Sequence, residues 1–200
     1  CVGVTSLFRK VIEQMKEIRC CPVCGSEQLQ KDIACKDFLV TGENFQLCVC
    51  MTCQFKFTNP RPEDSELPKY YLSEDYVSHT NSKKGLLFRM YHLVRSFTLK
   101  RKVALVRQHV SRGTLLDYGC GTGMFLREAS RSGFEAVGLE PDAGARNIAA
   151  ESGLQIFGQK SDLAPDSLFD AITAWHVLEH VSDLNETVAW FKQHLKKGGI

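Results

Sequence analysis

The chain has 200 residues, 44% hydrophobic and 24% charged, a composition typical of one soluble globular domain or of one domain with a small appendage. Its formal net charge is +2, so bulk charge gives no reason to expect a polyanion binder. Apolar runs fall short of the roughly 18 residues that cross a bilayer, so we expect no membrane contact. The chain begins with Cys1 and stops at Ile200, and we expect it to be a fragment.

The first segment, residues 5–19, carries apolar side chains at helical spacing and predicts a helix. Two short strands are expected after it, at 45–50 and 55–58. The sequence Asn59-Pro60-Arg61-Pro62 then interrupts regular structure, and we place a boundary there. The following polar stretch contains three tyrosines and predicts a short helix and a covering loop. The domains predicted from these features are 1–60, 61–85 and 86–200.

Eight of the nine cysteines lie within the first 53 residues. Four of them form two Cys-x-x-Cys pairs, namely Cys21, Cys24, Cys50 and Cys53. Two such turns facing each other present four thiolates tetrahedrally, as in a structural zinc ribbon. Disulfides or a redox pair are the alternative, and Cys20, Cys35 and Cys48 leave the ligand set open. A thiolate zinc site indicates a reducing compartment, so we expect the protein in the cytoplasm.

From residue 86 onward, helical and strand patterns alternate along the chain. Helices are expected at 86–110, 124–132, 142–152 and 184–197, and strands at 114–117, 135–140, 154–157 and 169–174. Such alternation is typical of an α/β fold with a doubly wound, mostly parallel, Rossmann-like sheet.

A glycine-rich loop follows the first of these strands. Ligands bind at the carboxyl ends of parallel strands, so this loop is the expected cofactor contact. Its candidate binding residues are Asp117, Gly119, Cys120, Gly121 and Gly123. The dinucleotide fingerprint fails here, because Met124 stands where the third glycine is required.

Two carboxylates define the ligand that would suit this loop. Asp117 places a negative charge at the strand tip, which disfavours a pyrophosphate and favours an ammonium group. Glu140 ends the next predicted strand, 21 residues after Gly119, where it can accept hydrogen bonds from both ribose hydroxyls. We therefore expect a ligand that has an amino acid moiety and a ribose.

Residues 115–123, Leu-Leu-Asp-Tyr-Gly-Cys-Gly-Thr-Gly, and residues 137–141, Val-Gly-Leu-Glu-Pro, closely resemble two motifs of class I S-adenosylmethionine-dependent methyltransferases. The resemblance continues to Gly199 and covers roughly residues 86–200. It implies S-adenosylmethionine as cofactor and Asp162 beside its adenine, while the last two strands of that fold are absent here. The cysteine segment resembles the front of bacterial methyltransferases that carry a zinc ribbon.

His176, Glu179 and His180 follow the strand expected at 169–174, and on a helical turn they would share one face. Three interpretations are open: a structural turn, a divalent metal site like that implied by similar O-methyltransferases, or general base catalysis. Deoxysugar C-methyltransferases are similar in organisation and imply a base near His180. We favour His180 as the base, with His176 lining the pocket and Glu179 orienting the imidazole.

Between Tyr76 and Leu116 the chain carries nine Lys or Arg residues and neither Asp nor Glu. This stretch is either a solvated helix face or a contact for an anionic substrate. The predicted function is methyl transfer to a small-molecule or sugar-containing acceptor. The alternatives are an RNA methyltransferase and a non-catalytic module that binds the cofactor.

Overall fold

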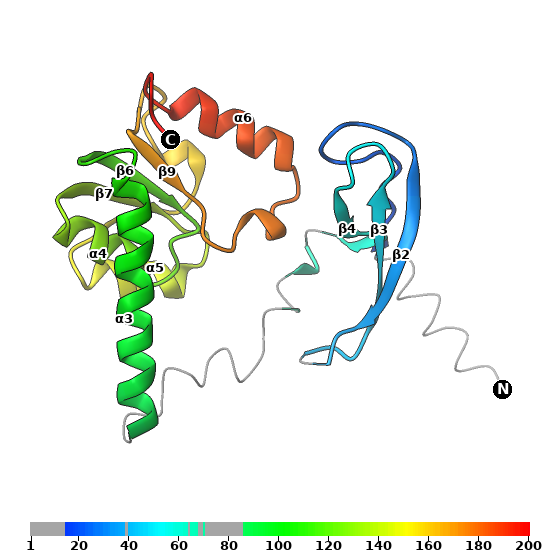
Figure 1. The fold of residues 1–200 in the computed structure, drawn as a ribbon, viewed down its shortest axis with the longest axis horizontal. Helices are drawn as coiled ribbons and strands as arrows, with labels where there is room; N and C mark the ends of the chain where they lie inside the picture. Colours follow the sequence, from blue (N-terminus) through cyan, green and yellow to red (C-terminus); the bar gives the residue numbers. More distant parts are fainter. Residues whose placement is uncertain (1–14, 39, 64, 68–69, 71–85) are drawn as a thin grey trace. The chain divides into compact units, whose positions relative to one another are not determined.

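The computed structural model describes residues 15–38, 40–63, 65–67, 70 and 86–200 (Figure 1). The chain divides into two compact units, Cys1–Lys84 and Gly85–Ile200. Most of the helix predicted at 5–19, and most of the predicted covering loop, lie outside the described residues. Within the described part, no helix combines the length and the apolar character needed to cross a membrane.

The first unit is built from short antiparallel strands. β2 (Leu29–Lys36), β3 (Asn44–Cys50) and β4 (Lys56–Thr58) form a three-stranded sheet in that order. β1 (Met15–Lys16) pairs with β5 (Arg61–Pro62) in a separate two-stranded ladder. β3 and β4 confirm the two strands that the sequence predicts in this segment.

The helix predicted at 5–19 is wrong at the end that the structure describes, because Met15–Lys16 forms β1. The backbone N–H of Ile18 donates to Asn59 Oδ1, and Asn59 Nδ2 donates to the carbonyl oxygen of Ile18, both at 2.8 Å. These contacts from distant sequence satisfy the backbone groups that a helix would pair locally. Arg61–Pro62, where we expected no regular element, forms β5 and pairs with β1.

β2 is the longest strand in the described part of the first unit, and the sequence did not predict it. Nearly all of its side chains are exposed, so it lacks the apolar alternation of a half-buried strand. It forms because β3 supplies a pairing partner, from Leu29 opposite Cys50 to Lys36 opposite Asn44. The hydrogen bonds of the ladder therefore hold this strand without a hydrophobic face of its own.

The second unit confirms the predicted α/β fold. Its strands are β6 (Gly113–Tyr118), β7 (Phe134–Leu139), β8 (Gln155–Phe157) and β9 (Ala171–Thr173). All neighbours are parallel and their order is β8-β7-β6-β9. The chain runs outward from β6 to β8 and returns to the other side of β6, so the topology switches between β6 and β9. Ligands bind at such a switch point in open α/β sheets.

The strands alternate with helices and short 3₁₀ turns. The helical elements are α3 (Leu86–Arg107), α4 (Met124–Arg131), α5 (Ala143–Ala150), η2 (Lys160–Asp162), η3 (Leu178–His180) and α6 (Leu184–His194). The last helix stops at His194 instead of residue 197, because Leu195 turns into a parallel bridge with Phe169.

The core explains why β6 lies at the centre of the sheet. Leu115 and Leu116 are both fully buried, and successive strand residues face opposite sides. Leu115 belongs to a cluster with Val103 of α3 and Leu126 of α4, whereas Leu116 belongs to a second cluster against which Trp190 of α6 packs. Helices therefore cover both faces of the sheet at β6.

Candidate functional site

The glycine loop after β6 is anchored to the end of β7. The backbone N–H groups of Gly119 and Cys120 both donate to the carbonyl oxygen of Leu139, at 2.7 and 3.1 Å. Gly121 has φ 53°, and a Cβ at this position would meet no atom within 4 Å. The backbone at Gly121 is therefore open to the close approach of a ligand.

Gly119 of this loop lies against Val177, which belongs to the segment after β9. Its φ is 74°, and a Cβ here would lie 2.5 Å from Val177 Cγ2. Since atoms cannot approach so closely, only glycine leaves room for Val177. The His-Val-Leu-Glu-His segment is thereby held against the glycine loop.

Asp117 is the one carboxylate of the described chain that is almost fully buried, at 3% exposure. Thr173 of β9 donates a hydrogen bond from Oγ1 to Asp117 Oδ1 at 2.7 Å. Burial raises the pKa of Asp117 to about 7; the Thr173 hydrogen bond and the charge of Lys102 oppose this rise, and Glu140 adds to it. The charge of Lys102 does not offset the effect of burial, so the ammonium group of a ligand would be a favourable partner for this carboxylate.

We expected Glu140 to be the last residue of its strand, but β7 ends at Leu139 and Glu140 follows it directly. Its Oε2 accepts from the backbone N–H of Gly121 at 2.8 Å, and its Oε1 accepts from that of Asp142 at 2.9 Å. A carboxylate has about four acceptor sites, so both oxygens retain capacity for hydroxyl groups. The loop and the Glu140 carboxylate, predicted as two parts of one site, lie within hydrogen-bond distance.

Cys120 and Asp162 have surroundings that the sequence did not indicate. The Cys120 thiol is buried, and a Cβ on Gly138 would lie 2.5 Å from its sulfur; burial, with Asp117 and Glu140, raises its pKa to about 12. The Cys120 thiol therefore packs inside the protein, where it donates to the carbonyl oxygen of Gly121 at 3.8 Å. The exposed Asp162 accepts from the backbone N–H groups of Gly158 and Gln159, both at 3.1 Å, and so caps its own turn.

The expected helical turn over His176, Glu179 and His180 is wrong. Only η3 is helical, and His176 precedes it with φ 58°, a left-handed conformation that takes its side chain out of register. His176 is 84% exposed, and its Nδ1 lies 3.8 Å from Glu179 Oε1. The side chains of His176 and Glu179 remain neighbours, but not through the i/i+3 spacing of a helical turn.

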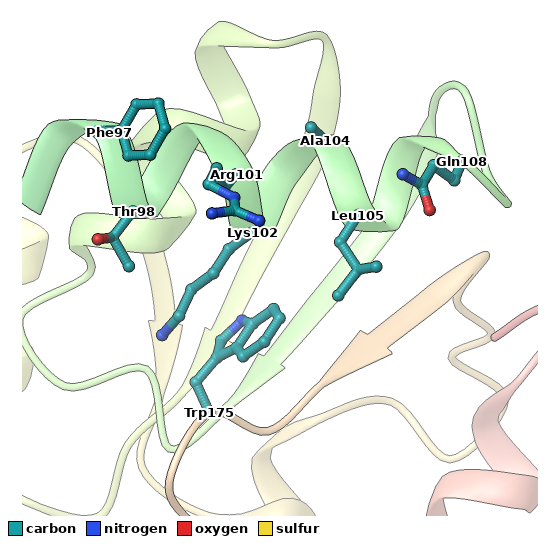
Figure 2. Close-up of a pocket in the computed structure, with 8 residues that line it drawn as sticks. All are labelled: Phe97, Thr98, Arg101, Lys102, Ala104, Leu105, Gln108 and Trp175. Atoms are coloured by element: carbon teal, nitrogen blue, oxygen red, sulfur yellow. The ribbon is translucent and has the colours of Figure 1, made fainter.

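A groove between α3 and Trp175 contains residues to which the sequence assigned no individual role (Figure 2). Lys102 Nζ lies 4.5 Å from the centroid of the Trp175 ring, and Arg101 lies 5.8 Å from that of Phe97. Burial lowers the pKa of Lys102, and Asp117 opposes that change. The charged groups of Lys102 and Arg101 therefore lie over aromatic rings in cation–π contacts. Trp175 could have been predicted to line a pocket, because it is an aromatic residue that closely follows the end of β9.

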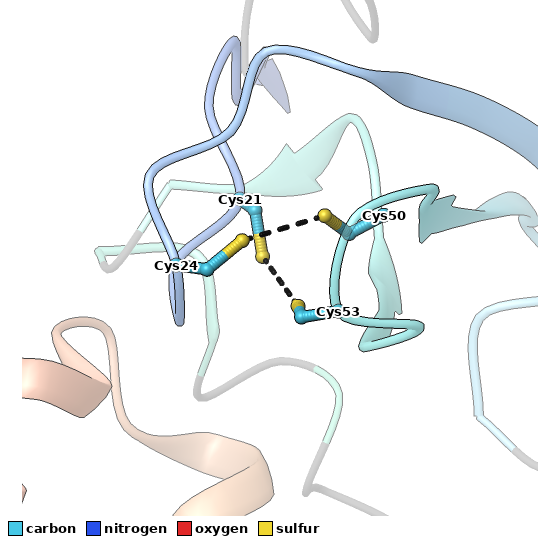
Figure 3. Close-up of side chains that lie close together, drawn as sticks. All are labelled: Cys21, Cys24, Cys50 and Cys53. Carbon is cyan, nitrogen blue, oxygen red and sulfur yellow. Dashed lines mark hydrogen bonds between the residues drawn. The ribbon is translucent and has the colours of Figure 1, made fainter.

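In the first unit, the four predicted zinc ligands form one cluster (Figure 3). The Sγ atoms of Cys21 and Cys53 are 3.6 Å apart, those of Cys24 and Cys50 are 3.5 Å apart, and all four lie within 4.8 Å. Zn–S bonds of about 2.3 Å in a tetrahedron place sulfurs about 3.8 Å apart, whereas a disulfide requires about 2.05 Å. The spacing fits zinc and not disulfides.

The two cysteine turns have matching backbone geometry despite their different sequences. Gly25 N–H donates to the carbonyl oxygen of Cys21 at 2.9 Å, and Gln54 N–H donates to that of Cys50 at 2.8 Å. Gly25 has φ 74° and Gln54 has φ 64°, so glutamine takes the conformation that glycine adopts freely. The matching turns aim their thiols at a common point.

The thiols of this cluster affect each other's ionisation. A hydrogen bond from the backbone N–H of Cys53 lowers the pKa of Cys50 to about 6. For Cys53, a backbone hydrogen bond from Phe55 lowers the pKa, but burial and the neighbouring thiols outweigh it and raise the pKa to about 12. One thiolate therefore forms readily and opposes ionisation of its neighbours. A divalent cation would remove this repulsion.

The parallel sheet of the second unit, with a glycine loop after β6, is the fold of class I methyltransferases. The methyltransferase-domain family matches residues 90–200, which is more than half of the chain. The chain belongs to this family.

Three known proteins illustrate the similarity. The ubiquinone biosynthesis O-methyltransferase of Rickettsia typhi is 28% identical over 151 residues, which cover 68% of this chain and 57% of that protein. Its namesake from Caulobacter vibrioides is 37% identical over 99 residues, 44% of this chain and 38% of that protein. Magnesium protoporphyrin IX methyltransferase from Synechocystis PCC 6803, solved with bound S-adenosylmethionine, is 14% identical, with a TM-score of 0.50 over 70% of this chain and 75% of that one. This last likeness shows the fold. The chain spans little more than half of the Rickettsia protein.

Proposed function

We propose that the protein transfers a methyl group from S-adenosylmethionine to a small-molecule acceptor. The observation that carries this proposal is the buried Asp117 carboxylate beside a glycine loop that is hydrogen-bonded to Glu140. Relatives named as O-methyltransferases support the reaction class and the type of acceptor. A sugar-containing acceptor and a cytoplasmic location stay predictions, and nothing in the described residues favours RNA.

Each cofactor contact has a physical reason in the chain. Asp117 binds the ammonium group, the backbone at Gly119 and Gly121 allows close approach, and Glu140 accepts from the ribose hydroxyls. Cys120 contributes through its backbone, Gly123 turns the chain into α4, and Asp162 contacts the adenine. When bound, the cofactor supplies a methyl group activated by its sulfonium charge. The protein aligns the acceptor with that group and excludes water.

The direct test is transfer of a labelled methyl group to acceptors in fractionated small-molecule extracts, with S-adenosylhomocysteine binding measured in parallel by calorimetry. We expect binding of S-adenosylhomocysteine and a labelled product in a small-molecule fraction. Absence of cofactor binding contradicts the proposal. Label found only in macromolecular fractions contradicts the small-molecule acceptor.

Replacing Glu140 tests the ribose contact. Glu140→Ala is expected to weaken S-adenosylhomocysteine binding by about 1–3 kcal/mol, because the charge-assisted hydrogen bonds to the ribose are lost. Calorimetric titration measures the change, and Glu135→Ala on the exposed side of the same strand is the matched control. An affinity equal to that of the control would show that the ribose is bound elsewhere.

We propose that His180 takes a proton from the acceptor, while Glu179 orients the imidazole and His176 lines the pocket. The support is position, since Val177 packs on Gly119 and holds this segment beside the cofactor loop. His180→Ala and His180→Gln are expected to lower turnover by about 10²–10⁴ without changing cofactor affinity. Single-turnover rates with and without chelator measure this, with the exposed His109→Gln as control. Loss of turnover with chelator alone would favour a metal, and unchanged rates would mean a structural turn.

We also propose that Cys21, Cys24, Cys50 and Cys53 hold a structural zinc ion. Four thiolates form a closed tetrahedral set, which suits zinc and leaves no open coordination position for catalysis. Cys20 and Cys35 are exposed and Cys48 is buried, and all three lie outside the cluster. The ion would therefore stabilise the ribbon fold and take no part in methyl transfer.

A further inference from the structure

A small groove between α3 and α4 gathers basic side chains on the face of the sheet covered by these two helices. It is lined by Arg95, Ser96 and Leu99 of α3 and by Met124, Arg127, Glu128 and Arg131 of α4. Its volume is about 160 Å³, well below the roughly 300 Å³ at which pockets begin to enclose whole drug-sized ligands. The groove is sized for one small group and not for a complete metabolite.

The charges around this groove are unbalanced. Three arginines face one glutamate, and α3 contains no Asp or Glu anywhere along its length. Arg127 and Arg131 are four residues apart on α4, a spacing at which like charges destabilise a helix. An anion between the two helices would remove this repulsion.

Arg127 is the best-positioned donor in the groove. Its Nη2 donates to Ser152 Oγ, which fixes the plane of the guanidinium group. Its Nε–H is buried and has no hydrogen-bond partner among the described residues, a condition that costs free energy and that few native groups tolerate. A guanidinium group presents two parallel N–H donors to a tetrahedral oxyanion, so an oxyanion can satisfy Nε and one Nη together after a small shift of the side chain.

We propose that the groove between α3 and α4 binds a phosphate group through the guanidinium groups of Arg95, Arg127 and Arg131. Glu128 also lines the groove, but its single negative charge does not balance the three arginines. Its carboxylate can accept a hydrogen bond from a protonated oxygen of the phosphate. This site uses none of the residues assigned to the methyl donor. Its success or failure is therefore independent of the proposed methyl transfer.

The test follows the arginine Nε–H resonances of the ¹⁵N-labelled full chain, with the Arg127 signal assigned by its loss in Arg127→Lys. At constant ionic strength, inorganic phosphate and phenyl phosphate are the probes, and chloride and acetate are the controls. We expect a saturable shift of the Arg127 signal with phosphate and not with the controls. Tighter binding of phenyl phosphate identifies a phosphate ester as the ligand, and tighter binding of inorganic phosphate identifies the free ion.

Arg131→Gln is expected to weaken phosphate binding about tenfold or more, whereas Arg107→Gln, outside the groove on α3, leaves it unchanged. A thermal melt equal to that of the unmodified chain shows that both variants are folded. The proposal is overturned by the absence of a saturable shift up to about 50 mM phosphate, a range that includes weak millimolar sites. It is also overturned by equal shifts with acetate, or by equal affinity of the two variants.

Discussion

The Asp117→Asn variant is expected to bind S-adenosylhomocysteine about a hundredfold more weakly and yet to melt at a higher temperature at pH 8. The carboxylate is 3% exposed, so its negative charge is costly when no cation is bound. Asparagine keeps an oxygen that can accept the hydrogen bond from Thr173 Oγ1, and it removes the charge that the ammonium group requires. Calorimetry and thermal melts measure the two opposite effects.

The control for this variant is Asp166→Asn, because Asp166 is exposed and lies outside the site. It should change neither the cofactor affinity nor the melting temperature. If Asp117→Asn lowers stability while affinity stays constant, Asp117 has a structural role only. If both fall together, the variant has disturbed the fold, and the pH dependence described next still decides the role of the charge.

The same carboxylate makes stability and binding respond to pH in opposite directions. Because the pKa of Asp117 is raised to about 7, the folded chain keeps this proton between about pH 4 and 7, whereas the unfolded chain releases it. The unfolding free energy of the cofactor-free protein therefore falls as pH rises through this window. Cofactor binding needs the ionised form, so affinity is expected to fall about tenfold for each pH unit below 7. Asp117→Asn should flatten both dependences.

Zinc removal is expected to unfold the first unit while the second unit stays folded. Cys21, Cys48 and Cys50 are buried in the first unit, but β2 contributes almost no buried side chain, so little apolar area stabilises the ribbon without a metal. Structural zinc sites contribute about 10–16 kcal/mol of apparent binding free energy, which is folding free energy in so small a unit. Hydrogen exchange after chelation should show lost protection in β3 and retained protection in β6 and β7.

Two cysteine variants separate a metal effect from a general effect of thiol loss. Cys50→Ser removes a fully buried member of the cluster and should reproduce the effect of the chelator. Cys35→Ser removes an exposed thiol outside the cluster and should leave the zinc content at one ion per chain. Protein that is prepared under reducing conditions and contains no zinc would refute this assignment.

The order of helices and strands after residue 86 could be predicted because its signals are local. A strand buried on both faces needs a continuous apolar run such as Leu115-Leu116, and the helices between strands need one apolar face. The placement of Asp117 and Glu140 also followed from sequence, since both carboxylates come at or just after strand ends, and parallel strands end at one edge. Cysteine spacing likewise predicted the cluster, because each pair forms its own tight turn.

Other features depended on partners that are distant in sequence, so no local pattern could indicate them. β1 is extended because Asn59 binds Ile18, and β2 exists because β3 offers a free edge, although β2 has almost no buried face. The left-handed backbone at His176, next to the Val177 side chain that packs on Gly119, replaced the helical turn that residue spacing alone suggested. Whether a carboxylate at a strand tip is buried, and so titrates near neutral pH, likewise depends on which side chains surround it. Periodicity in the sequence shows which face of a helix or strand is apolar. Which atoms of other elements that face contacts is decided only by the tertiary packing.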